Sequence, residues 1–147
     1  MSFSVTRKCP SCGTLNRIPA RHLADTGRCG SCRAILAPVD EPIAVDQAAF
    51  DDIIREARVP VFVDFWAGWC GPCHMAAPEV AALAREMAGK ALILKVDTEA
   101  HPELAERYRI QSLPAFLVFR DGRIVLERMG AVPRAEMRRW LDQVMAA

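Results

Sequence analysis

Features that would point to a membrane or to nucleic acid are missing from this sequence. No stretch of its 147 residues approaches the about 18 consecutive apolar residues of a membrane-spanning helix. Its first residues, 1–8, lack the apolar core of a secretory signal peptide. A formal net charge of +1 gives no overall bias toward a polyanion or an acidic lipid surface. We therefore expect a cytoplasmic protein that does not bind a membrane, and nucleic acid is not an expected partner.

The charges that are present are unevenly distributed. Residues 1–37 carry six basic side chains against one acid, a net charge of +5, whereas the remainder carries −4. Residues 38–42 contain two prolines and two acids without periodicity, which is typical of a linker. The length and this division predict a small module at 1–37, a linker at 38–42 and a domain of ordinary size at 43–147.

Four of the six cysteines form two Cys-x-x-Cys pairs in the first module: Cys9, Cys12, Cys29 and Cys32. The pairs are separated by sixteen residues, within the range expected of a four-cysteine zinc site. A segment this short buries too little apolar surface to fold without a cross-link such as a bound metal ion. Zn²⁺ binds four thiolates in tetrahedral geometry. We predict one bound zinc ion; two disulfides, a second redox pair or an iron–sulfur cluster are the alternatives. Gly13 and Gly30 are expected to suit the two turns.

The remaining cysteines, Cys70 and Cys73, flank Gly71 and Pro72. This loop follows a nearly continuous apolar run at 61–66 and precedes a segment with apolar residues at helical spacing. Cys70 is therefore placed at a helix N-terminus, where unpaired N–H groups and the helix dipole favour a thiolate. A structural disulfide or a pair of metal ligands is the alternative, but this context favours redox chemistry.

The second domain shows alternating strand and helix patterns. Strands are predicted at 43–45, 61–66, 91–97, 115–119 and 124–126, and helices after Asp46, after Cys70, at 102–108 and near the C-terminus. Asp46 is the expected N-cap of the first helix. The order βαβαβαββα predicts an α/β fold with a mixed sheet, its last two strands antiparallel.

Asp64 is an acid within the apolar run at 61–66. Burying an ionised carboxylate costs several kcal/mol unless it is paired, so its pKa should be raised. A carboxyl group that titrates near neutral pH can take a proton from a thiol. The alternative is a solvated acid at a strand end.

Residues 63–73, Val-Asp-Phe-Trp-Ala-Gly-Trp-Cys-Gly-Pro-Cys, resemble the active-site stretch of thioredoxins, and the resemblance extends from about Ile43 to the C-terminus. With its N-terminal module the chain is similar to the bacterial thioredoxin 2 group. The resemblance implies a thioredoxin fold, a mixed five-stranded sheet flanked by four helices, with a zinc-ribbon-like domain. It also implies that Asp64 lies beneath the second cysteine and that Lys95 tunes it.

The same resemblance implies the substrate-binding residues. The expected set is the cysteine loop with Trp69, Gly71 and Pro72, a cis peptide between Leu113 and Pro114, and Gly130, which would leave room for the substrate chain. His74 departs from the commonest pattern, in which a lysine follows the second cysteine. A histidine there makes the charge of the first helical turn pH-dependent and should tune the redox poise.

The sequence therefore predicts a monomeric protein disulfide reductase. Cys70 would attack a disulfide of a target protein, and Cys73 would resolve the mixed disulfide. The resemblance implies regeneration by an NADPH-dependent thioredoxin reductase. A disulfide oxidase or isomerase is one alternative; another is a nucleic-acid-binding or partner-binding zinc module that uses the second domain as a scaffold.

Overall fold

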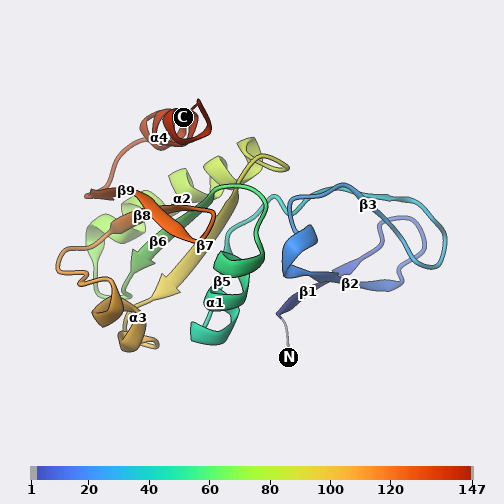
Figure 1. Cartoon of the computed structure of the whole chain (residues 1–147), viewed down its shortest axis with the longest axis horizontal. Helices are drawn as coiled ribbons and strands as arrows, with labels where there is room; N and C mark the ends of the chain where they lie inside the picture. The colour runs from blue at the N-terminus through green and yellow to red at the C-terminus, as the bar shows by residue number, and fades with distance from the viewer. Residues whose placement is uncertain (1–2, 147) are drawn as a thin grey trace.

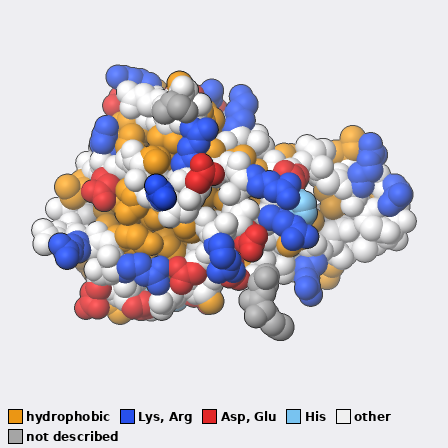
Figure 2. All heavy atoms as spheres, viewed as in Figure 1, with side chains coloured by type: hydrophobic (Ala, Val, Ile, Leu, Met, Phe, Trp, Pro, Cys, Tyr) orange, Lys and Arg blue, Asp and Glu red, His pale blue; other side chains and the backbone are white. Residues whose placement is uncertain are grey.

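The computed structural model describes residues 3–146. A small N-terminal module of short hairpins lies beside a larger α/β part that contains the main sheet (Figure 1). Within the described residues no helix has the length and apolar character needed to cross a bilayer. Several basic side chains are scattered over the narrow end of the molecule that the module forms (Figure 2), in agreement with the net charge of that segment.

The main sheet has five strands in the order β5-β7-β6-β8-β9. Their bounds are Ile43–Ala44 for β5, Val61–Trp66 for β6, Leu92–Asp97 for β7, Ala115–Arg120 for β8 and Arg123–Met129 for β9. β5, β7 and β6 are parallel, and β8 and β9 are antiparallel to their neighbours. The predicted mixed five-stranded sheet is confirmed. The first strand is one residue shorter than expected and the last is longer at both ends.

Four helices cover the sheet: α1 (Gln47–Glu56), α2 (Gly71–Glu86), α3 (Pro102–Arg107) and α4 (Arg134–Ala146). Phe50 of α1 and Leu104 of α3 pack with Val63 on one face of the sheet. Leu83 of α2 and Trp140 of α4 pack with Phe62 on the other face. Because neighbouring residues of β6 point to opposite faces, Asp64 lies on the face that α2 and α4 cover.

Local sequence signals account for the ends of several elements. The Asp46 carboxylate accepts a hydrogen bond of 2.8 Å from the Ala49 N–H, so this residue is the N-cap of α1 as predicted. The β8–β9 hairpin turns at Asp121 and Gly122, with φ of 54° and 79°. Two consecutive positive φ angles are typical of a type I′ turn, for which Asp-Gly is a favoured pair.

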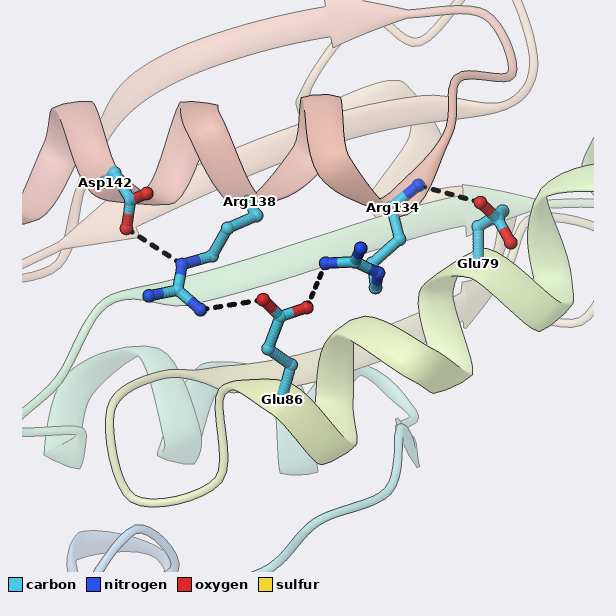
Figure 3. A network of polar contacts seen from close by, with 5 residues as sticks. All are labelled: Glu79, Glu86, Arg134, Arg138 and Asp142. Atoms are coloured by element: carbon cyan, nitrogen blue, oxygen red, sulfur yellow. Dashed lines mark hydrogen bonds and ion pairs between the residues drawn. The ribbon is translucent and has the colours of Figure 1, made fainter.

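An ion-pair network joins α2 to α4. The carboxylate of Glu86 pairs with Arg134 and with Arg138, and Arg138 also pairs with Asp142 at 2.9 Å (Figure 3). Glu79 accepts a hydrogen bond of 2.9 Å from the Arg134 N–H. The network thus connects the helix that follows the Cys70 loop to the start of the last helix.

The N-terminal module consists of two hairpins, β1 (Ser4–Lys8) with β2 (Leu15–Pro19) and β3 (Gly27–Arg28) with β4 (Ile35–Leu36). Their turns have the same backbone bonds: the Gly13 N–H donates to the Cys9 carbonyl and the Arg33 N–H donates to the Cys29 carbonyl. Gly13 and Arg33 both have positive φ, 78° and 67°. Gly30 lies in the second turn, as expected, while the left-handed position of that turn is occupied by Arg33.

The module packs directly against the larger part. Ala20, Leu23 and Val39 belong to the same apolar cluster as Phe50 of α1. The Phe3 N–H donates a hydrogen bond of 2.7 Å to the Asp52 carboxylate on α1. Residues 38–42, predicted as a linker, contain the buried Val39, whose N–H donates to the Leu23 carbonyl. This segment is therefore part of the packed interface.

Candidate redox site and metal centre

The two cysteines of the predicted redox loop form a disulfide at the start of α2. Cys70 is the N-cap of this helix, and its sulfur accepts a hydrogen bond of 3.1 Å from the Cys73 N–H. This is the contact that would stabilise a Cys70 thiolate after reduction. Each of the two residues is only 3% exposed in the disulfide form. The two cysteines do not differ in exposure, because the disulfide packs both sulfurs with Ala67 and Leu113.

The strand β8 begins beside this loop. The peptide between Leu113 and Pro114 is cis, and Pro114 is buried. The Pro114 carbonyl accepts a hydrogen bond of 2.9 Å from the Gly130 N–H. Gly130 has φ of 93°, and a Cβ placed on it would meet nothing within 4 Å. Its backbone conformation requires glycine, and the space around it is open, as expected for a place where another chain approaches.

An open groove runs beside the disulfide. Trp69 is 72% exposed, and Gly71 and Pro72 are also exposed. The groove has a volume of about 560 Å³, and its lining includes Trp69, Thr98, Glu106, Arg109, Ile110 and Leu113. Residues from the Cys70 loop, α3 and the segment before β8 therefore meet here, although they are far apart in the sequence.

Asp64 is 1% exposed, and within the described residues its Oδ1 atom has no hydrogen-bond partner. Burial raises the pKa of Asp64 to about 7, against the opposing charge of Lys95. Lys95 lies in register with Asp64 on the neighbouring strand β7, and its Nζ atom is 5.0 Å from the centre of the Trp66 ring. The predicted raised pKa is confirmed.

His74 lies in the first turn of α2, beside the active-site loop. Its Nε2 atom is 2.7 Å from the Gly68 carbonyl, so this nitrogen carries a proton and donates. The ring is also 6.5 Å from the ring of Trp66.

The sequence analysis missed two residues that hold the same loop. The Gly68 N–H donates to the Glu99 carboxylate at 3.1 Å. Thr98 donates twice to the Trp66 carbonyl, from its N–H at 2.9 Å and from its hydroxyl at 3.0 Å. Both residues directly follow β7, which is parallel to β6, so they lie at the same edge of the sheet as the loop. That parallel pairing is the signal that could have identified them.

The four other cysteines converge at the tip of the module. Their sulfur atoms all lie within 4.8 Å of one another, with Cys9 and Cys29 buried and Cys12 and Cys32 exposed. The N–H groups of Ser11 and Ser31 each donate to a cysteine sulfur at 3.4 Å. Hydrogen bonds, first from the Cys32 backbone and then from the Asn16 side chain, lower the pKa of Cys29 to about 6. These contacts favour a thiolate at Cys29, the form in which cysteine binds a metal. A hydrogen bond from the Ala34 backbone lowers the pKa of Cys32, but the neighbouring Cys12 thiol raises it to about 11.

Comparison with known proteins agrees with both sites. Residues 41–143 match the family described as Thioredoxin, and residues 8–34 match the one described as Thioredoxin 2, N-terminal, a zinc ribbon. Thioredoxin C-3 of Corynebacterium nephridii is 38% identical over 92% of each chain. Thioredoxin 1 of Chlorobaculum tepidum is 44% identical over 60% of this chain and 87% of its own.

A solved structure supports the same assignment. A mutant thioredoxin from Halobacterium salinarum superposes with a TM-score of 0.68 at 32% identity, covering 74% of this chain and 94% of its own. The match spans the catalytic fold, whereas the cysteine cluster is accounted for by the zinc-ribbon match at 8–34. The chain therefore belongs to the thioredoxin family of protein disulfide reductases and carries an N-terminal zinc ribbon of the thioredoxin 2 kind.

Proposed function

We propose that Cys70 is the nucleophile that reduces disulfides of target proteins and that Cys73 resolves the intermediate. This proposal rests on the position of the Cys70–Cys73 pair at the N-terminus of α2. A Cys70 thiolate attacks one target sulfur, the target disulfide breaks, and a mixed disulfide forms. Cys73 then attacks the Cys70 sulfur, which releases the target as a dithiol and leaves the Cys70–Cys73 disulfide. Two electrons pass from this protein to the target in each cycle.

Asp64 is proposed to accept the proton that the Cys73 thiol loses during resolution. Its carboxyl group lies on the sheet face that α2 covers, and its pKa of about 7 suits proton exchange at neutral pH. Lys95, in register on β7, opposes the rise in that pKa and so tunes the base. His74 is proposed to tune the pair from the first turn of α2, where its ring donates to the Gly68 carbonyl of the active-site loop.

Target segments are proposed to bind across the loop and the cis-proline segment. Trp69, Gly71 and Pro72 offer exposed surface on one side of the disulfide. On the other side Leu113, Pro114 and Gly130 offer a backbone edge with open space over the glycine. An extended target chain would pair with that backbone and present its disulfide to Cys70.

One Zn²⁺ is proposed to be held by Cys9, Cys12, Cys29 and Cys32. Bound zinc would supply the tetrahedral cross-link that joins the two hairpins of the module. The four thiolates require a reducing compartment, which supports a cytoplasmic location. We further propose a monomer, regenerated by an NADPH-dependent thioredoxin reductase.

A nucleic-acid-binding role for the module is less well supported. Phe3 is the only aromatic residue at positions 1–37, and it packs against the apolar cluster that includes Phe50. It is not available to stack on a base.

Insulin reduction tests the proposed function. The full-length protein with dithiothreitol should accelerate the precipitation of reduced insulin chains, and the Cys70→Ser variant should not. Metal analysis of the same preparation should give one zinc per chain. A wild-type protein that leaves insulin reduction at the rate of dithiothreitol alone would contradict the assignment, and the absence of zinc would contradict the metal proposal separately.

A further inference from the structure

Arg109 has a backbone conformation that is unusual for its residue type. It follows Tyr108, the C-cap of α3, and has φ of 53°. The Arg109 N–H donates to the Glu106 carbonyl at 3.1 Å, and the Ile110 N–H donates to the Ala105 carbonyl at 2.9 Å. These two bonds form a Schellman motif, in which the residue at the position of Arg109 is usually glycine.

The motif itself does not need an arginine side chain. Both hydrogen bonds are between main-chain atoms, and the apolar contact that accompanies such motifs is supplied by Ile110 and Leu104, which share one cluster. A glycine would form the same bonds without the steric cost of a Cβ at positive φ. A strained residue of this kind at the rim of a binding groove points to a function for its side chain.

The neighbouring Arg107 provides a contrast. Its guanidinium pairs with Asp51 at 2.6 Å and lies over the rings of Phe50 and Tyr108, so it serves the fold. Arg109 is exposed, and no ion pair or cation–π contact of its side chain is found among residues 3–146. Instead it lines the groove beside Trp69.

This groove leads to the reactive disulfide. Leu113, one of its lining residues, packs against the cluster that contains Cys70 and Cys73. Glu106 and Arg109 put one negative and one positive side chain on the same lining. A guanidinium in this position can bind a carboxylate through two parallel hydrogen bonds.

We propose that Arg109 is a specificity-determining residue that recognises an acidic side chain next to the disulfide of a target protein. The inference rests on the proposed function, because it concerns the substrates of the same site. The partner class is a protein segment with aspartate or glutamate beside its cystine, and the strain at Arg109 is retained for this contact.

The test uses two disulfide-linked peptides that differ only in carrying aspartates or asparagines beside the cystine. The measured quantity is the second-order rate constant for reduction by the fully reduced full-length protein at low salt. The wild type should prefer the acidic peptide by about 5-fold or more, and the preference should shrink at high salt. In Arg109→Gln, which keeps the backbone strain and removes the charge, the ratio should fall to about 1–2, whereas Arg109→Lys should keep part of the preference.

Arg123→Gln is the matched control. Arg123 is opposite Arg120 in the register of β8 and β9, next to the turn that joins these strands. This turn is at the end of the sheet opposite to Phe65 and the active-site loop. Its substitution removes the same net charge and should leave the ratio unchanged. Equal losses in Arg109→Gln and Arg123→Gln would overturn the proposal in favour of a general charge effect, and an unchanged ratio in Arg109→Gln would also overturn it.

Arg109→Gly separates recognition from structure. Relief of the positive φ should raise Tm by about 2–4 °C while the acidic preference is lost. A fall in Tm would show that the arginine serves the fold and would contradict the proposal. Failure of the wild type to reduce either peptide would instead overturn the proposed function, whereas reduction of both at equal rates would overturn only this inference.

Discussion

At the residue scale, the properties of the active site depend on two sulfurs with similar burial but different hydrogen bonds. Cys70 accepts an N–H bond at the helix start, and this bond favours it as the thiolate that attacks. Cys73→Ser should therefore accumulate covalent mixed disulfides with target proteins, since the resolving thiol is missing. Non-reducing electrophoresis checks this. Trapping by Cys70→Ser, with none by Cys73→Ser, would reverse the assignment.

The raised pKa of Asp64 predicts that the free energy of unfolding depends on pH. Its pKa is about 7 in the folded protein, against about 4 in an unfolded chain, so between these values the unfolded chain loses a proton that the folded one retains. The free energy of unfolding should therefore fall as pH rises from 4 to 7. Asp64→Asn does not titrate and should exceed the wild type by roughly 2–4 kcal/mol above pH 7. Urea unfolding of the oxidised protein at several pH values measures this difference.

The same variant should be less active even though it is more stable. Without a proton acceptor, the resolution step should slow by roughly 10-fold or more at neutral pH. Asp40→Asn, at an exposed position, is the control for both measurements. An unchanged resolution rate in Asp64→Asn would remove the proposed role in proton transfer.

At the element scale, the α2–α4 network is expected to hold the active-site helix against the last helix. Glu86→Gln leaves Arg134 and Arg138 without their shared anion and should lower the free energy of unfolding by about 1 kcal/mol. The loss should be smaller in high salt because the network is partly exposed. Glu41→Gln, at an exposed position, should have no effect. Thermal unfolding at two ionic strengths distinguishes these outcomes.

The elements were predictable where one periodicity dominates, as in the apolar run of β6 and the helical spacing of α2. The contacts between loops were not. Glu99 reaches the Gly68 N–H from a loop that follows a different strand, and no local pattern of charge marks it. The positive φ of Arg33 was missed because residue type did not indicate it: Arg33 stands four residues after Cys29, as Gly13 does after Cys9, but it is not a glycine. The disulfide, Asp64 and the four-cysteine cluster were found because residue type and spacing determine their chemistry.

At the scale of the whole molecule, the zinc ribbon shares its apolar contacts with the catalytic domain. Leu23 is 1% exposed and packs in the cluster that includes Phe50. A chain that begins near Asp40 keeps every proposed catalytic group and should keep reductase activity while folded, but it should lose roughly 2–5 kcal/mol of stability. Leu23→Ala in the full chain should reproduce part of that loss with zinc still bound. A truncated chain as stable as the full one would show that the two parts are independent.

The topology also orders the events of synthesis. Both hairpins that carry the four cysteines of the ribbon have been synthesised once the chain reaches Leu36. By contrast β6, which leads to Cys70, pairs with β7 and β8, so it cannot take its place in the sheet until the chain has been synthesised to about Arg120. At ribosomal speeds this interval lasts several seconds. A metal ion bound by the ribbon at this stage would occupy four thiols before the redox pair is in place, which would leave only Cys70 and Cys73 to pair with each other. With its metal bound, the N-terminal ribbon would thus reduce incorrect disulfide pairing among the six cysteines during synthesis.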